Sequence, residues 1–288
     1  MRNSNVKYLF LLPGFLVILV TTIVPIFSVV NLSFQEWIVT RSPTPGPYIG
    51  FDNYIKALTD DDFWNAVTIT LAYVVIVTAF SIAIGMFIAV MVQRVTFLST
   101  VVKTLLIFPF AISLTLRGYS FRFMLLEGQG VLDKILDTVS PWTADVLWLG
   151  HPYWALFWVA VPTFWAWGPL AGLMLLGALN NISTEIFEAA SLDGASRWRT
   201  FWNITMPLLR PMIFVLVLLI TLFSIRMFDL VLTMTFGGPG RATETLNFFI
   251  YRIGFKIFNM GYASALAMLL TIVLIFLSYL YSRVLITE

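Results

Sequence analysis

The sequence contains no cysteine, only one histidine and few charged residues. Without cysteine the chain forms no disulfide, no thiolate metal site and no thiol redox centre. The single histidine, His151, leaves little room for a histidine-based metal site or proton relay. Asp, Glu, Lys and Arg make up 11% of the 288 residues, whereas soluble domains average roughly 25%. This scarcity excludes an ordinary soluble domain, and a net charge of +2 does not favour nucleic-acid binding.

Apolar residues dominate instead, at 59% of the chain with a mean hydropathy of +0.91. A bilayer core requires about 20 predominantly apolar residues per helix. Because lipid offers the backbone no hydrogen-bond partner, each such segment is predicted to be helical. Six segments qualify: 8–31, 66–92, 101–125, 154–179, 211–235 and 262–283. The predicted fold is an all-α polytopic membrane protein with six transmembrane helices, and residues 1–288 are predicted to form a single transmembrane domain.

The first apolar segment is predicted to be a retained helix, because it is longer than a signal-peptide core and no clear small-x-small cleavage site follows it. With the N-terminus inside, the inner segments are the shorter ones and carry the higher density of Lys and Arg, as the positive-inside rule expects. Their basic residues are Arg2, Lys7, Arg94, Lys103, Arg197, Arg199, Arg210 and Arg283. This distribution predicts that both termini and the stretch 180–210 are cytoplasmic.

The longest polar-rich interruption in the second half of the chain runs from Glu188 to Pro211. Upstream of it, Ser183 or Thr184 can cap a helix that would end near Leu192. Asp193-Gly194 then predicts a turn, since glycine readily adopts a left-handed conformation.

A second short helix is predicted from a cap at Ser196 to an end at Pro207. Its apolar residues fall at helical spacing on one face: Trp198, Phe201, Trp202 and Thr205. One interpretation is an amphipathic connector that lies on the bilayer. The other is a docking element, because small residues let another protein surface approach closely beside Glu188; these are Ala189, Ala190 and Ala195.

The spacing of this stretch resembles the EAA loop of ATP-binding-cassette (ABC) importer permeases. The matching residues are Glu188, Ala189, Ala190, Asp193, Gly194, Ala195, Phe201, Ile204, Pro207 and Pro211. A later series resembles carbohydrate importers of the maltose and glycerol-3-phosphate type: Phe228-Asp229, Leu232-Thr233, Gly237-Gly238-Pro239 and Ala242-Thr243-Glu244. The likeness extends over nearly the whole chain.

The resemblance implies a permease subunit that forms half of the pathway for a sugar or sugar derivative across a bacterial or archaeal inner membrane. It implies a second homologous permease, two ATP-binding subunits and an extracytoplasmic substrate-binding protein as partners. The coupling loop, about 184–211, would dock an ATPase subunit. The sequence has no G-x-x-x-x-G-K-[ST] phosphate loop, so the chain is not predicted to be an enzyme. We expect no cofactor in this chain, and ATP and magnesium in the partner subunits.

Two other classes are weighed against this one. An intramembrane enzyme would need a nucleophile-base pair or a cluster of His, Asp and Glu within the spans, and none is evident. An ion-coupled secondary transporter usually carries buried acids and internal repeats, whereas Asp229 is the only acid well inside a predicted span.

Three charged residues are candidates for the substrate pathway. Arg117 either snorkels to lipid headgroups or helps to pass an anionic sugar derivative. Arg226 and Asp229 are three residues apart and would share a face of the fifth helix. Charges inside a span usually face the protein interior or a wet cavity. We therefore predict that Arg226 lines the translocation cavity and that Asp229 has a packing role; no metal site is predicted.

Overall fold

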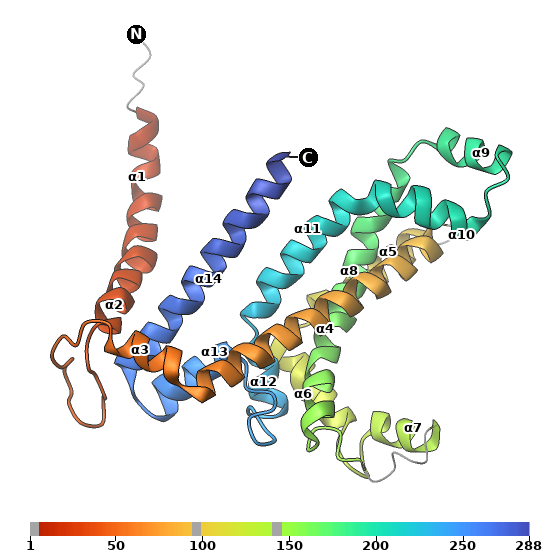
Figure 1. The fold of residues 1–288 in the computed structure, drawn as a ribbon. Coiled ribbons are helices and arrows are strands. Elements are labelled where there is room, and N and C mark those ends of the chain that lie inside the picture. Colours follow the sequence, from red (N-terminus) through yellow and green to blue (C-terminus); the bar gives the residue numbers. More distant parts are fainter. Residues whose placement is uncertain (1–5, 94–98, 140–145, 288) are drawn as a thin grey trace. The chain divides into compact units, whose positions relative to one another are not determined.

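The structure is a computed structural model that describes residues 6–93, 99–139 and 146–287. Within these ranges the chain is helical apart from loops and two isolated β-bridges, which confirms the all-α prediction. Figure 1 shows the helices in chain order. Arg2 and Arg94, which support the predicted orientation, lie outside the described residues.

The chain divides into two compact units, and the single-domain prediction stays a prediction. The first unit comprises Met1–Trp64 and Phe249–Leu280, and the second comprises Asn65–Phe248 and Tyr281–Glu288. The elements wholly or mostly in the first unit are α1 (Val6–Ile18), the π-turn η1 (Leu19–Ile23), α2 (Val24–Ser33), α3 (Asp52–Thr59), η4 (Arg252–Lys256) and α14 (Met260–Thr287), and α13 (Leu246–Tyr251) is divided equally between the two units.

The loop before α3 is closely tied within the first unit. Asn53 is buried, and its side-chain amide donates to the carbonyls of Ser33 and Gln35, each at 3.0 Å. The hydroxyl of Tyr262 donates to Asp60 at 2.8 Å. These contacts join the end of α2, the helix α3 and the start of α14.

The second unit contains the elements that build the candidate site. They are most of α4 (Asp61–Val92), α5 (Ser99–Ala111), α6 (Leu114–Met124), α7 (Val131–Val139), α8 (Pro152–Asn180), α9 (Thr184–Leu192), α10 (Arg197–Thr200), the π-turn η3 (Phe201–Thr205), α11 (Met206–Ile225) and α12 (Asp229–Met234). Helix α8 lies at the centre of this unit. In its most apolar 18-residue stretch 72% of the residues are buried, whereas in that of α4 only 28% are. A Cβ added at Gly85 of α4 would lie 2.8 Å from Ala171 Cβ, so glycine is what allows α4 to approach α8 this closely.

Among the described residues five helices are long and apolar enough to span a membrane, and the number is six if one bent pair of helices is counted as a single span. The five are Phe10–Ser33, Asp61–Val92, Pro152–Asn180, Arg197–Ile225 and Met260–Arg283. The third predicted span, 101–125, is not one continuous helix, because Val101–Ala111 and Leu114–Met124 meet at 91°. Ser113 is extended at the break, and its hydroxyl accepts from the Leu116 N–H, so it starts a new helix.

The fifth span also differs from its prediction, because α11 ends at Ile225 instead of continuing to 235. The carbonyls released at this break have side-chain partners. Asn247 donates to the Arg226 carbonyl at 2.9 Å, and the Thr245 hydroxyl donates to the Met227 carbonyl at 2.9 Å. Arg226 and Asp229 therefore do not share one helix, and the predicted i, i+3 relation between them is wrong.

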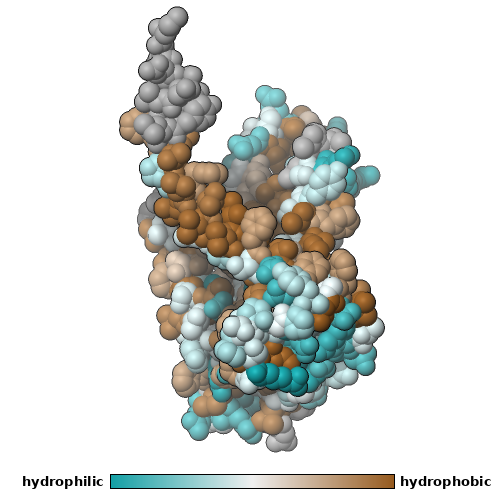
Figure 2. All heavy atoms as spheres, turned by 90° about the vertical axis from the view of Figure 1, so that its left-hand side faces the viewer, coloured by the Kyte–Doolittle hydropathy of each residue, from teal (hydrophilic) through white to brown (hydrophobic). Residues whose placement is uncertain are grey.

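Large apolar side chains are exposed along the spans. Phe27 is 70% exposed and Phe276 is 58% exposed. Figure 2 shows hydrophobic side chains gathered on the surface of one face. An exposed apolar surface of this extent is typical of contact with lipid or with another subunit.

Candidate functional site

Helix α9 carries the EAA residues and is closed at both ends by local hydrogen bonds. Ser183 is its N-cap, and the serine hydroxyl accepts from the Glu185 N–H. At the other end the Ala195 N–H donates to the Ala190 carbonyl at 2.9 Å, and the Gly194 N–H donates to the Ser191 carbonyl at 3.1 Å. This pair of bonds is a Schellman motif with glycine at its left-handed position. Gly194 has φ +71°, so the predicted helix and turn are both confirmed.

The predicted coupling residues do not all face outward. Glu188 and Ala189 are exposed, as are Asp193 and Gly194 of the turn. Ala195 is half-buried, and Ala190 is only 7% exposed. The surface available to a partner is therefore the Glu188–Ala189 side of α9 together with its C-terminal turn. Ala190 instead packs inside the loop, where a small side chain is needed.

The second helix begins as predicted but does not end at Pro207. The Ser196 hydroxyl accepts from the Arg199 N–H and caps α10. Helix α10 then passes through the π-turn η3 directly into α11, and Pro207 lies in the first turn of α11. Proline in a helix lacks a donor and crowds the carbonyl four residues back. A π-turn is a wider, local departure from α-helical bonding, and here it lies just where that carbonyl would be crowded.

The π-turn also changes the predicted apolar face. Trp198 is 73% exposed and packs edge-to-face on Trp202 at 5.7 Å, whereas Thr205 is only 7% exposed. A regular helix would place these residues on one side, but the wide turn rotates Thr205 inward. The prediction that these residues share one face of a regular helix is therefore wrong.

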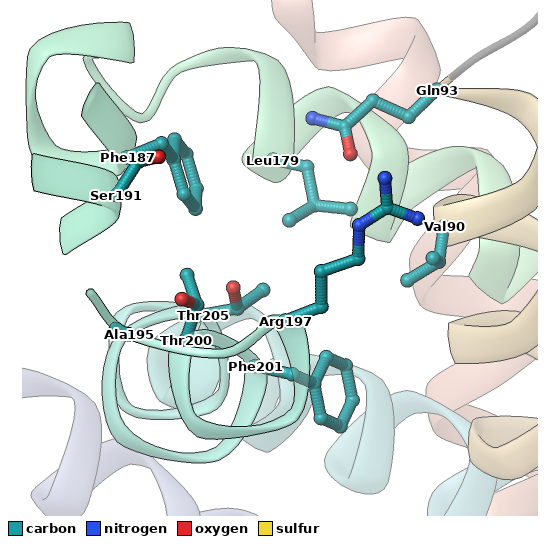
Figure 3. A pocket seen from close by; sticks show the side chains of 10 residues that line it. All are labelled: Val90, Gln93, Leu179, Phe187, Ser191, Ala195, Arg197, Thr200, Phe201 and Thr205. Atoms are coloured by element: carbon teal, nitrogen blue, oxygen red, sulfur yellow. The ribbon is translucent and has the colours of Figure 1, made fainter.

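A cavity of about 310 Å³ lies between the coupling loop and the ends of α4 and α8. Figure 3 shows Arg197 extending into it toward Gln93, with Thr200 and Thr205 on the α10–η3 side. The sequence carries no signal that Gln93, which follows α4, lies opposite Arg197. The cavity is therefore bordered by both helices of the coupling loop and by two spans.

Arg117 is buried against protein carbonyls and does not snorkel to headgroups. Its side chain is 5% exposed. The Nε–H donates to the Ile112 carbonyl at 3.1 Å, and Nη1 donates to the Pro162 carbonyl of α8 at 3.1 Å. The first bond caps the end of α5 at the 91° break, and the second fixes the bent pair on α8. Arg117 thus holds the break in place, and its predicted role toward an anionic substrate stays a prediction.

Arg117→Ala is expected to lower the thermal unfolding temperature of the purified protein by several degrees. Hydrogen bonds to charged groups contribute about 1.5–3 kcal/mol each, and the alanine variant loses two of them. Because the break would relax, uptake of charged and neutral glycosides should fall together. Unchanged stability with a selective loss of charged-glycoside uptake would instead place Arg117 on the substrate pathway.

Arg226 and Asp229 lie on one cavity even though they are on different elements. The cavity has a volume of about 280 Å³ and is lined by Leu114, Phe223, Arg226, Met227 and Asp229. Arg226 is exposed, and its Nε–H donates to the Leu222 carbonyl at 3.3 Å. Asp229 is half-buried in the first turn of α12. In the described part of the chain no ion pair joins the two, so the guanidinium keeps free donors toward the cavity.

Sequence reasoning missed the pairing of α6 with α12, which sets the walls of this cavity. Gly118 lies directly against Thr233 and Leu230. Arg122 donates from Nη1 to the Thr233 carbonyl at 3.2 Å. The only signal for this packing was a glycine in an otherwise bulky segment, and a single sequence does not reveal its partner.

Comparison with solved structures supports the fold. A bacterial ABC transporter involved in the import of the acidic polysaccharide alginate matches with a TM-score of 0.78 at 21% identity, covering 96% of this chain and 95% of that chain. A structure of bacterial alginate ABC transporter in complex with alginate pentasaccharide-bound periplasmic protein matches with a TM-score of 0.77, again at 21% identity, covering 97% and 95%.

Curated relatives match over nearly the full chain. The trehalose/maltose transport system permease protein MalF of Thermococcus litoralis is 28% identical over 98% of this chain and 94% of its own length. The sulfoquinovosyl glycerol transport system permease protein SmoG of Agrobacterium fabrum is 28% identical over 97% and 90%. The probable ABC transporter permease protein YurN of Bacillus subtilis is 31% identical over 98% and 96%.

A family model, described as binding-protein-dependent transport system inner membrane component, matches residues 81–287. This range contains the coupling loop, both broken spans and the two cavities. The match confirms the prediction of a multi-pass ABC importer permease that is not itself an enzyme. The chain therefore belongs to the family of binding-protein-dependent transport system inner membrane components.

Proposed function

We propose that this permease forms half of the translocation pathway for a sugar or sugar derivative. The main support is the cavity that Arg226 and Asp229 line. It places guanidinium donors and a carboxylate acceptor where the third and fifth spans are broken. Broken helices at membrane depth are tolerated where they line a cavity. The class of substrate is supported by the names of relatives that act on trehalose or maltose, on sulfoquinovosyl glycerol and on diacetylchitobiose.

The proposed complex contains a second homologous permease, two ATP-binding subunits and the extracytoplasmic binding protein. ATP and magnesium would be bound by the ATP-binding subunits. Both termini and the coupling loop would be cytoplasmic, and the exposed apolar sides of the spans would face lipid and the second permease. Helix α9 suits docking on an ATPase subunit, because its ends are closed by its own hydrogen bonds and it can move as a rigid body.

Glu188→Lys is expected to release the ATPase subunit and to abolish uptake while the permease still inserts and folds. The exposed carboxylate becomes a cation at the centre of the docking surface, so a complementary contact turns into a repulsive one. Co-purification of the ATPase subunit and ATP-driven uptake would be measured in the same membranes.

Glu185→Lys is the matched control, since Glu185 is also exposed but lies one turn earlier on α9. It should retain most of the ATPase subunit. Equal retention in Glu188→Lys and in the unsubstituted protein would contradict docking through α9. Uptake that persists without ATP and stops with an uncoupler would instead support an ion-coupled transporter.

Arg226→Ala is expected to reduce substrate uptake by about tenfold or more without lowering the yield of assembled complex. A planar guanidinium can donate to two oxygens of one ligand, and loss of a charge-assisted bond costs about 1.5–3 kcal/mol. Arg226→Lys retains the positive charge but not the planar pair of donors, so its uptake should lie between that of Arg226→Ala and that of the unsubstituted protein.

Asp229→Ala is expected to act differently, by lowering the yield of assembled complex. Asp229 lies in the first turn of α12, where a negative charge stabilises the helix. Yield would be measured by size-exclusion chromatography of the solubilised complex. Full-rate uptake by Arg226→Ala, or normal yield with lost uptake for Asp229→Ala, would reverse these assignments.

A further inference from the structure

A separate polar cavity lies among the end of α6, the start of α7 and the turn before α8, elements that Figure 1 shows near one another. Its volume is about 230 Å³. Its polar lining consists of Arg122, Glu127, Asp133 and Trp148, and Met234 of α12 forms part of the apolar wall. None of these residues belongs to the coupling loop or to the Arg226 cavity.

Trp148 lines this cavity, but its buried indole N–H is not among the groups that a ligand can reach. The residue is 4% exposed, and its indole Nε1–H makes no hydrogen bond within the described part of the chain. Edge-to-face contacts with Trp154 at 5.6 Å and Trp158 at 5.7 Å hold the ring. The N–H is enclosed by the protein and does not face the cavity, so Trp148 contributes part of the wall there and not a donor.

Asp133 brings a buried acceptor to the same cavity. It is 4% exposed, and its Oδ2 accepts from the Gly128 N–H at 2.7 Å. Gly128 has φ +65°, and this turn holds the carboxylate at the start of α7. Among the described residues no cation pairs with Asp133, and its other oxygen has no hydrogen bond. The carboxylate can therefore accept a hydroxyl from a ligand.

Arg122 and Glu127 are the polar side chains that line the more exposed side of this cavity. One nitrogen of Arg122 donates to the Thr233 carbonyl at 3.2 Å, and the guanidinium lies 5.9 Å from the centre of the Phe236 ring. Because a guanidinium has five N–H donors, others remain for a ligand. Glu127 is exposed and adds a second carboxylate.

This mixture of donors and acceptors selects one class of ligand. Two carboxylates disfavour an anion, and Arg122 disfavours a bare cation. Vicinal hydroxyls both donate and accept, so they match Arg122 and Asp133 together. We propose that this cavity binds one neutral hexose unit of a saccharide, as a subsite distinct from the Arg226 cavity. The choice of a saccharide rests on the proposed function.

The test uses the permease complex in nanodiscs without the binding protein, and methyl α-D-glucoside and D-glucuronate as probes. Saturation-transfer NMR and tryptophan fluorescence should report millimolar binding of the neutral probe and much weaker binding of the anion. Asp133→Asn should weaken binding about tenfold, which is the effect of one lost hydrogen bond to a charged group. Asp137→Asn, on the same helix but outside the cavity lining, should bind as the unsubstituted protein does.

Several outcomes would overturn the subsite. These are equal binding of both probes, no glucoside signal, or an undiminished signal in Asp133→Asn. The Asp133→Asn change is nearly isosteric, and its unfolding temperature checks that the variant is folded. Loss of the signal in Arg226→Ala alone would assign the binding to the other cavity. Weakened docking of the binding protein by Asp133→Asn, without a glucoside signal, would mean that a protein side chain occupies the cavity. ATP-driven sugar uptake with no glucoside signal would reject the subsite and leave the proposed function standing.

Discussion

Gly194→Val is expected to abolish ATP-coupled uptake while the six spans still assemble. Gly194 has φ +71°, and nothing lies within 4 Å of an added Cβ, so the substitution acts through the backbone and not through a clash. A side chain in the left-handed region costs roughly 1–2 kcal/mol, and more for a β-branched residue such as valine. The cost is concentrated in the turn that closes α9, which would lose its fixed direction relative to α10.

The measurement is sugar uptake and ATP hydrolysis by the reconstituted complex, together with its unfolding temperature. Gly177→Val is the matched control, because Gly177 also has open space around it but lies within α8 without a positive φ. It should transport normally. Normal uptake by Gly194→Val would mean that the closed turn is not needed for coupling.

Gly118→Ala is expected to destabilise the permease by about 1–3 kcal/mol, the usual cost of overpacking. A single added methyl would clash with Thr233 Oγ1 and would lie 3.3 Å from Leu230 Cδ2. Helix α6 would have to move away from α12, and this would disturb the walls of the Arg226 cavity. A lower unfolding temperature, a lower yield of complex and slower uptake should appear together.

A second substitution separates this clash from a general effect of alanine. Adding Thr233→Ala removes the hydroxyl but leaves a Cβ 2.9 Å from the new methyl, so recovery should be partial. Gly177→Ala should be neutral or slightly stabilising, since alanine favours a helix over glycine by about 1 kcal/mol. If Gly118→Ala is as stable as Gly177→Ala, the close packing of α6 on α12 is wrong.

The coupling loop was largely predictable because its structure is made by nearby residues. Ser183 and Ser196 cap helices that begin at the next residue. At the end of the first helix, Gly194 and Ala195 donate to carbonyls three and five residues back, respectively. Such bonds depend on residue types at short, fixed spacings. The continuation of the helix through Pro207 was not predictable in this way, because a π-turn has no comparable signature in a single sequence.

By itself, the sequence determined the class of the protein, the approximate positions of its spans and the two capped helices of the coupling loop. Hydropathy measures only whether a segment suits lipid, and it does not show whether the helix in that segment is continuous. Only the tertiary structure decided where the third and fifth spans end. The partners that stabilise those breaks are far along the chain: Arg117 reaches the Pro162 carbonyl, and Asn247 reaches that of Arg226. The free energy of a broken helix depends on such distant donors, so the breaks appear only once the chain has folded.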